Sequence, residues 1–290
     1  MFDFRYHALS LVAVFLALVI GLLLGVAIGD QGLVSSAERD IRDSLRKDVR
    51  DARAESARLR AQVNEEKELE RQFYPLMVGG RLPAQRVGIV ALGGIPDSVV
   101  GNVREALAST GGELVNVSVV KVPPDTAELA TDERGTRFAG LAQSPDVLRR
   151  FGRRIGVDFV RGGRDLAATS STLLSSSSGT LDGLGAVVLY RQGGEVSGPG
   201  GAATAALEDG LIAGFRRARA PLVGVEETSR NPTGIPWFAD RGVSSVDNVD
   251  QLTGRASMVF VLAGASGAFG TKDTATRLLP EAAGRGGDGP

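Results

Sequence analysis

Two adjacent carboxylates, Glu226 and Glu227, directly follow a short apolar run and are well placed for acid–base chemistry. Together with Asp97 they could supply a general base or the oxygen ligands of a hard cation. The only histidine is His7, far away in sequence, and the chain has no cysteine. This composition excludes a Ser-His-Asp triad and a zinc site built on histidine or thiolate ligands. We therefore interpret the two glutamates as residues of a solvated loop, and we predict no catalytic residues and no enzyme activity.

Patterns for binding anions are equally unspecific. Gly93-Gly94 lies between an apolar run and a helical stretch, but the third glycine of a dinucleotide fingerprint and the Lys-Ser/Thr of a P-loop are missing. The glycine-rich segment 198–201 has the same weakness, so we predict no bound cofactor. A cluster of arginines surrounds Phe151 and could meet an anionic envelope polymer or a lipid headgroup, although the wet face of a helix has the same pattern. The cluster comprises Arg149, Arg150, Arg153 and Arg154.

The elements that would position these residues begin at Arg86, where short apolar runs alternate with glycine-rich turns and helical stretches, as in α/β domains. Strands are predicted at 87–92, 114–120, 186–190 and 222–225, with an edge strand at 243–249 and an ambiguous run at 258–262. Helices are predicted at about 98–109, after Ser144-Pro145 and at about 202–217. The serine-rich segment 169–180 is predicted to be a loop.

Near the N-terminus, residues 8–28 contain no charged side chain. At ~1.5 Å per residue this run is about as long as the ~30 Å hydrocarbon core of a bilayer, so we predict a membrane helix. A cleaved signal peptide ending near Gly25-Val26-Ala27 is the alternative, but its apolar core would be only about 7 to 15 residues long. Phe2, Phe4 and Tyr6 precede the run, where an interfacial aromatic belt is expected.

Small side chains recur at every fourth position of this predicted membrane helix. One face of the helix would therefore allow two backbones to approach closely, which favours pairing in lipid. We predict a homodimer or a higher homo-oligomer, with the membrane-pairing residues Ala13, Ala17, Gly21, Gly25 and Gly29.

Two sequence signals give opposite predictions for the orientation of this helix in the membrane. Arg5 precedes the run, whereas four bases follow it closely, which by the positive-inside count favours a cytoplasmic C-terminal flank. Long domains translocate largely regardless of charge, and acidic residues alternate with those bases. We therefore expect the N-terminus inside and the bulk of the chain outside the cytoplasm, in an inner or an outer membrane. The four bases are Arg39, Arg42, Arg46 and Lys47.

Between the apolar run and about Tyr74 the sequence is charged, and apolar residues recur at alternating spacings of four and three. This spacing predicts a short coiled coil, although a single amphipathic helix lying on its own domain has the same pattern. Pro75, Gly79, Gly80 and Pro83 are predicted to end the helix and form a hinge. The predicted seam comprises Leu45, Val49, Ala52, Leu59 and Val63, with Ser56 at one intervening position.

The fold class predicted from these patterns is α/β: an N-terminal transmembrane helix, a coiled-coil stalk helix and a Rossmann-like α/β globular domain. The predicted boundaries are 1–30 for the anchor, 31–80 for the stalk and hinge, 84–280 for the α/β domain and 281–290 for a disordered tail. A net charge of −1 gives no electrostatic footprint for nucleic acid, so we expect none as a partner.

Two segments carry a family resemblance. The N-terminal block Phe4-Arg5-Tyr6-His7, Ser10 to Leu18 and Gly21 to Gly25 resembles the N-terminus of the MctB-like copper transport proteins of actinobacteria. The segment Gly267 to Ala275, followed by Leu278-Leu279-Pro280, is similar to the C-terminal signature of that family. The resemblance implies a cell-envelope protein linked to copper efflux or copper tolerance, described in the family as channel-forming in the outer membrane.

The sequence does not predict a dedicated copper site within one protomer. Copper(I) prefers thiolate and thioether ligands, and copper(II) prefers imidazole. The chain has no cysteine, one histidine and three methionines, Met1, Met77 and Met258, which are far apart in sequence. One membrane helix cannot enclose a pore, and no barrel-type strand pattern is present. We therefore expect copper as a transported ion rather than a bound cofactor.

Two hypotheses of function remain open. The first is an oligomeric channel component in copper efflux. The second is a non-transporting anchored scaffold that recruits an envelope or division partner, since relatives in the family are also linked to a septal complex that regulates cell-wall hydrolysis.

Overall fold

The computed structural model of the chain describes residues 4–29, 33–194 and 196–281. Phe2 and all but the first residue of the predicted tail, 281–290, lie outside these ranges. The chain divides into two compact units, residues 1–68 and residues 69–290. We call the second unit the head.

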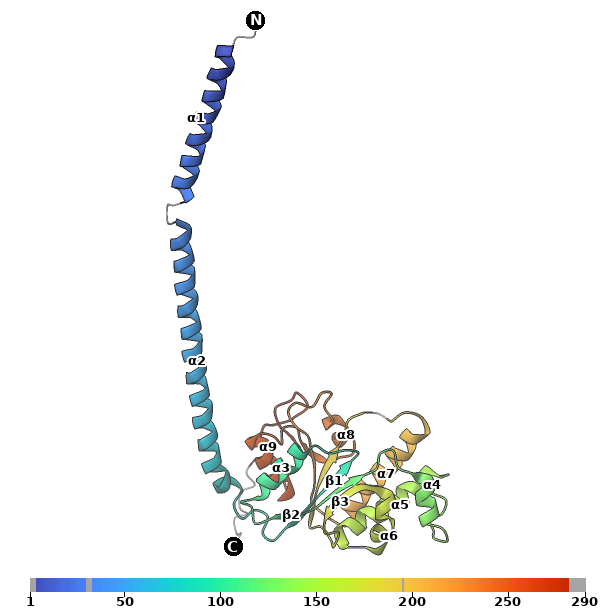
Figure 1. Cartoon of the computed structure of the whole chain (residues 1–290). Coiled ribbons are helices and arrows are strands. Elements are labelled where there is room, and N and C mark those ends of the chain that lie inside the picture. The colour runs from blue at the N-terminus through green and yellow to red at the C-terminus, as the bar shows by residue number, and fades with distance from the viewer. Residues whose placement is uncertain (1–3, 30–32, 195, 282–290) are drawn as a thin grey trace. The chain divides into compact units, whose positions relative to one another are not determined.

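The first unit contains the helix α1 (Phe4–Gly29) and most of the helix α2 (Leu33–Val78), both labelled in Figure 1. Within α1, Tyr6–Ala27 has a mean hydropathy of 2.9 and is long and apolar enough to cross a membrane. The predicted apolar N-terminal helix is confirmed.

The helix end predicted over Pro75, Gly79, Gly80 and Pro83 lies at Val78, because α2 continues through Pro75 and stops directly before Gly79. The Gly79 N–H donates to the Pro75 carbonyl at 2.8 Å and closes the last turn. Tyr74 and Val78 are buried in the core of the head, and the Tyr74 hydroxyl donates to the Ala106 carbonyl at 2.9 Å. This burial favours the helical turn despite the proline.

The head is built on one seven-stranded mixed sheet of order β3-β2-β1-β4-β5-β6-β7. All neighbouring pairs are parallel except β2 and β3, which are antiparallel. The strands of the middle of the sheet are continuous apolar runs because both of their faces are covered. The strands are β1 (Arg86–Leu92), β2 (Glu113–Val120), β3 (Leu174–Gly179), β4 (Ala186–Arg191), β5 (Leu222–Val225), β6 (Ser244–Val246) and β7 (Ala268–Phe269).

Helices cover both faces of this sheet, and each face has its own hydrophobic core (Figure 1). One core joins Val87 and Ile89 of β1 to α3 (Asp97–Leu107), α9 (Leu252–Leu262) and the end of α2. The other joins Val90 and Leu92 to the remaining helices, since successive strand residues point to opposite faces. These are α4 (Thr126–Asp132), α5 (Pro145–Arg161), α6 (Arg164–Leu173), α7 (Gly198–Arg217) and α8 (Ile235–Asp240).

The α/β class and the strands predicted at 87–92, 114–120, 186–190 and 222–225 are confirmed. The loop predicted at 169–180 is wrong, because this segment forms the end of α6 and all of β3. The strand predicted at 243–249 is shorter and is not an edge, since β7 pairs with β6. The ambiguous run 258–262 is helical and lies in α9.

Candidate functional site

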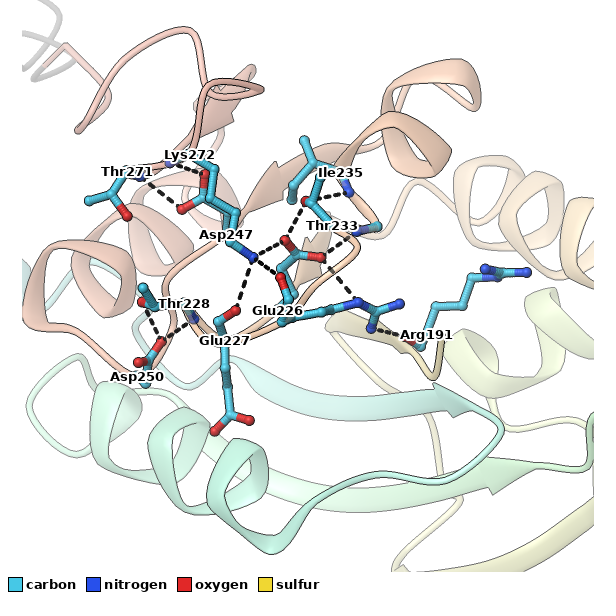
Figure 2. A network of polar contacts seen from close by, with 12 residues as sticks. Arg191, Glu226, Glu227, Thr228, Thr233, Ile235, Asp247, Asp250, Thr271 and Lys272 are labelled. Carbon is cyan, nitrogen blue, oxygen red and sulfur yellow. Dashed lines mark hydrogen bonds and ion pairs between the residues drawn. The ribbon is translucent and has the colours of Figure 1, made fainter. Parts of the chain in front are cut away.

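Glu226 follows β5 directly and is the centre of a buried polar network at the carboxyl ends of the strands (Figure 2). Its side chain is fully buried and is reached by two cations. The Lys272 Nζ lies 2.6 Å from Oε1, and the Arg230 Nε lies 3.4 Å from Oε2. The Thr233 hydroxyl donates to Oε1 at 2.5 Å, and the Gly234 N–H donates to Oε2 at 2.7 Å.

Lys272 connects this network to the segment that follows β7. Its ammonium also donates to the carbonyls of Glu227 at 3.2 Å and Arg230 at 2.9 Å. Its backbone N–H donates to the buried Asp247 carboxylate at 3.0 Å, and that of Thr271 does so at 2.8 Å. A side chain at Gly270, where φ is +142°, would overlap the Asp247 carboxylate. The segment therefore needs glycine next to the buried charge.

The solvated-loop interpretation of the two glutamates is wrong for Glu226, because this side chain is buried, its oxygens accept hydrogen bonds from three groups, and Arg230 adds an ion pair. Two cations and two buried carboxylates balance in charge, so the network binds the C-terminal segment to the sheet. Asp97 does not join it: that residue is exposed and lines a separate groove with the serines of β3. In the described ranges no group of three or more His, Cys, Asp or Glu residues could hold a metal ion.

Sequence reasoning missed the partners of Glu226 because they lie up to 46 residues away along the chain. One signal pointed to them, since Lys272 lies inside the segment Gly267 to Ala275 that carries the family resemblance. No pattern of spacing relates Lys272 to Arg230 or Thr233.

A second buried ion pair joins the end of β4 to α7, where the Arg191 Nε donates to the Glu208 Oε1 at 3.0 Å. Burial raises the pKa of the Glu208 carboxyl above its ordinary value, and Arg191 opposes this rise. Burial also raises the pKa of Tyr190. The positive charge of Arg230, which lies over the Tyr190 ring, opposes this rise. These shifts follow from desolvation in a packed structure and do not by themselves indicate chemistry.

The Gly93-Gly94 turn is filled by a side chain of the protein. The Gly94 N–H donates to the Gln192 Oε1 at 2.5 Å, and Gly93 adopts a φ of +88°. Backbone geometry accounts for these glycines, and the protein supplies the acceptor that an anion would have provided.

The predicted pairing residues all lie on α1, with Gly29 as its last residue. A Cβ added at Gly21 or Gly25 would meet nothing within 4 Å. On α2 the seam residues Leu45, Val49, Leu59 and Val63 keep between 41% and 62% of their surface exposed. Ala52, Ser56, Leu59 and Val63 line one shared hollow along the helix.

Arginines from several elements surround a groove of about 590 Å³ on the head. We call this feature the arginine groove. It contains three members of the predicted cluster but not Arg149, which instead pairs with Asp146 at 2.6 Å. Its lining residues are Arg137, Phe138, Arg150, Arg153, Arg154, Val157, Arg161 and Arg217.

Comparison with known proteins adds one finding. No curated protein sequence matches the chain. The family profile described as copper transport outer membrane protein, MctB, matches residues 1–144 and 165–280. The match includes α1, α2, the Glu226 network and all seven strands of the sheet, so the chain belongs to the MctB family of copper transport outer membrane proteins.

Proposed function

We propose that this chain is a membrane-anchored cell-envelope protein that takes part in copper transport as a homo-oligomer. The observation that carries the proposal is the family match over nearly the whole chain, from the apolar helix to the C-terminal segment. The anchor is α1, whose length and hydropathy suit a bilayer. The head lies outside the cytoplasm in this proposal.

The need for an oligomer follows from α1, since among the described residues no other helix is long and apolar enough to cross a membrane. One helix satisfies its own backbone hydrogen bonds but cannot surround a path for an ion, so any path requires several copies or a partner. Two surfaces support association of copies. The glycine face of α1 has room for a second backbone, and α2 presents apolar residues at alternating spacings of three and four.

The proposed transport does not use a copper site inside one protomer. Copper prefers soft sulfur or imidazole ligands, and in the described part of the chain no group of three or more His, Cys, Asp or Glu residues could hold a metal ion. Met258 is fully buried in the core of the head, where it packs among apolar side chains. Copper is cargo in this proposal, and no enzyme activity or cofactor is required.

A second candidate function is a non-transporting scaffold for envelope assembly or division. The observation that favours this function is a difference between the two units in how their side chains are paired. The buried charges of the head are internally paired, as in a stable binding module, whereas the apolar residues of α2 are exposed for association. An anchored, dimerising stalk that presents a folded head suits the recruitment of a partner protein.

A deletion strain distinguishes the two functions. It is complemented with the full chain, with residues 1–68 alone, and with the full chain carrying Ser56→Leu. This substitution places an apolar side chain at the polar position of the predicted coiled-coil seam. Copper accumulation and copper tolerance are measured beside septation and wall integrity. Copper transport requires that only the chains with the head restore copper tolerance. Normal copper handling with defective septation would reject transport and support the scaffold.

A further inference from the structure

The arginine groove combines a high positive charge with the absence of neutral polar side chains. Six of its eight lining residues are arginines, and the other two are Phe138 and Val157. The whole chain has a net charge of −1, so the groove is a local concentration of charge rather than a consequence of a basic protein. Like charges gathered in this way repel one another unless an anion lies between them.

Most of these arginines have no acidic partner. Arg154 is the exception: its Nε lies 2.8 Å from Asp165 and 3.4 Å from Asp158. Arg137 lies over the Phe138 ring, 4.8 Å from its centroid. The other four form no ion pair with any residue that the structure describes, and they are exposed to solvent: Arg150, Arg153, Arg161 and Arg217.

The fold brings these side chains together by two devices. Positions 150, 153, 154, 157 and 161 share one face of α5, as the helical spacing requires. Glycines allow α7 to approach this helix closely: a Cβ on Gly214 would lie 2.7 Å from the Cα of Gly156. This close contact brings the last turn of α7, which carries Arg217, to the same groove.

We propose that the arginine groove binds a linear polyanion through its phosphate groups. Guanidinium groups donate two parallel hydrogen bonds to phosphate oxygens, and several of them along a groove match a ligand with closely spaced charges. The lining has no amide or hydroxyl side chain that would select a neutral sugar. Recognition therefore depends on charge and on the spacing of the phosphates.

The shape favours a single chain over a membrane surface. The groove is recessed: Phe138 is buried in its wall, and Arg154 keeps only 41% of its side chain exposed. A flat bilayer would touch the five exposed arginines, whereas a flexible chain can also enter the hollow beside Arg154. This inference does not depend on copper transport.

The test uses the full chain in nanodiscs of zwitterionic lipid and inorganic polyphosphate as the probe. Polyglutamate of matched charge and vesicles containing phosphatidylglycerol are the comparison ligands. The variant Arg150→Gln/Arg153→Gln removes two groove arginines. Arg149→Gln is the matched control, since it is adjacent in sequence, exposed and outside the groove. Thermal unfolding of each variant verifies that the head is folded.

We expect polyphosphate to bind the natural chain more tightly than polyglutamate does. The double variant should weaken that binding by about tenfold or more, and the control should leave it unchanged. The affinity should also fall steeply with salt. Equal losses in both variants, equal affinity for polyglutamate, binding to the anionic vesicles alone, or no polyphosphate binding would each overturn the proposal.

Discussion

Glycines at the same helical spacing have different surroundings in the two units of this protein. In the head, Gly152 and Gly156 of α5 face Gly210 and Gly214 of α7, and added Cβ atoms would meet backbone atoms of the facing helix. In α1, a Cβ at Gly21 or Gly25 would meet nothing within 4 Å. The pattern is thus satisfied inside the chain in the head and left open in the anchor. Pairing through the α1 glycines stays a prediction, and it is the contact between chains that would fill this open face.

The same contrast holds for charged and apolar side chains. The buried Glu226 and Glu208 of the head have partners from their own chain. On α2, apolar residues of the predicted seam remain exposed. Because the buried groups of the head are paired within the head, substitutions that break these pairs should lower its stability. Substitutions in α1 should instead alter association between chains and leave the head folded.

The largest expected effect comes from Lys272→Met. Glu226 would remain buried with Arg230 as its only cation, and breaking such a buried pair costs about 3 kcal/mol. Chemical unfolding of the full chain in detergent measures the loss. Lys121→Met is the control, since among the described residues the Lys121 ammonium donates only to the exposed Ser171 carbonyl and pairs with no buried charge. A loss no larger than that of the control would contradict the view that the network holds the C-terminal segment in place.

A somewhat smaller loss is expected for Gly214→Val, which forces α5 and α7 apart. The added Cβ would lie 2.7 Å from the Gly156 Cα and 2.9 Å from the Val157 backbone nitrogen, and overpacking of this kind costs about 2 kcal/mol. Gly101→Ala on α3 is the matched control, because a Cβ there meets nothing within 4 Å. The control should be neutral or slightly stabilising. Equal effects at both positions would mean that the close helix contact does not matter.

In the anchor, Gly25→Ile should weaken self-association several-fold without changing the unfolding of the head, because a branched side chain keeps two backbones apart. A membrane two-hybrid assay measures the association. Leu24→Ile is the control, since it preserves volume at a neighbouring position off the small-residue face. Unchanged association in the Gly25 variant would remove the case for pairing through this face, and with it the contrast between the two units.

How much the sequence predicts depends on where the determining contacts lie. β1, β4 and β5 are continuous apolar runs, and their prediction needs no knowledge of the rest of the chain. β3 was missed because Ser175 to Ser178 are exposed and have no apolar alternation; pairing with β2 makes the segment a strand. Pro75 stays helical because distant residues bury Tyr74 and Val78, which a local signal cannot predict.

The candidate sites, too, are predictable only where the determining residues lie close together in sequence. Four arginines of the groove lie on α5, and three of them belong to the cluster predicted around Phe151. Arg137 and Arg217 join them only in the folded head. The burial of Glu226 depends on Lys272 and Thr233. The coiled coil, the Rossmann-like details and the pairing face stay predictions, because they concern contacts or comparisons outside a single chain.

The smallest expected effect concerns Glu208 and tests how the head tolerates a buried charge. Burial raises the pKa of this carboxyl in the folded state above the ordinary 4.5, so its ionisation opposes folding. At lower pH the carboxyl is neutral in both states and this cost is absent. As the pH rises through the folded-state pKa, the cost appears and then persists. Glu208→Gln keeps an acceptor for Arg191 but cannot ionise.

The free energy of unfolding of the natural chain, minus that of Glu208→Gln, should therefore decrease as the pH rises from about 4.5 through the folded-state pKa. Urea unfolding at a series of pH values measures this difference. Glu105→Gln provides the control, because Glu105 keeps 65% of its side chain exposed. A difference that increases with pH would mean that attraction to Arg191 outweighs desolvation. The pair would then stabilise the head, and its other buried charges would need the same reassessment.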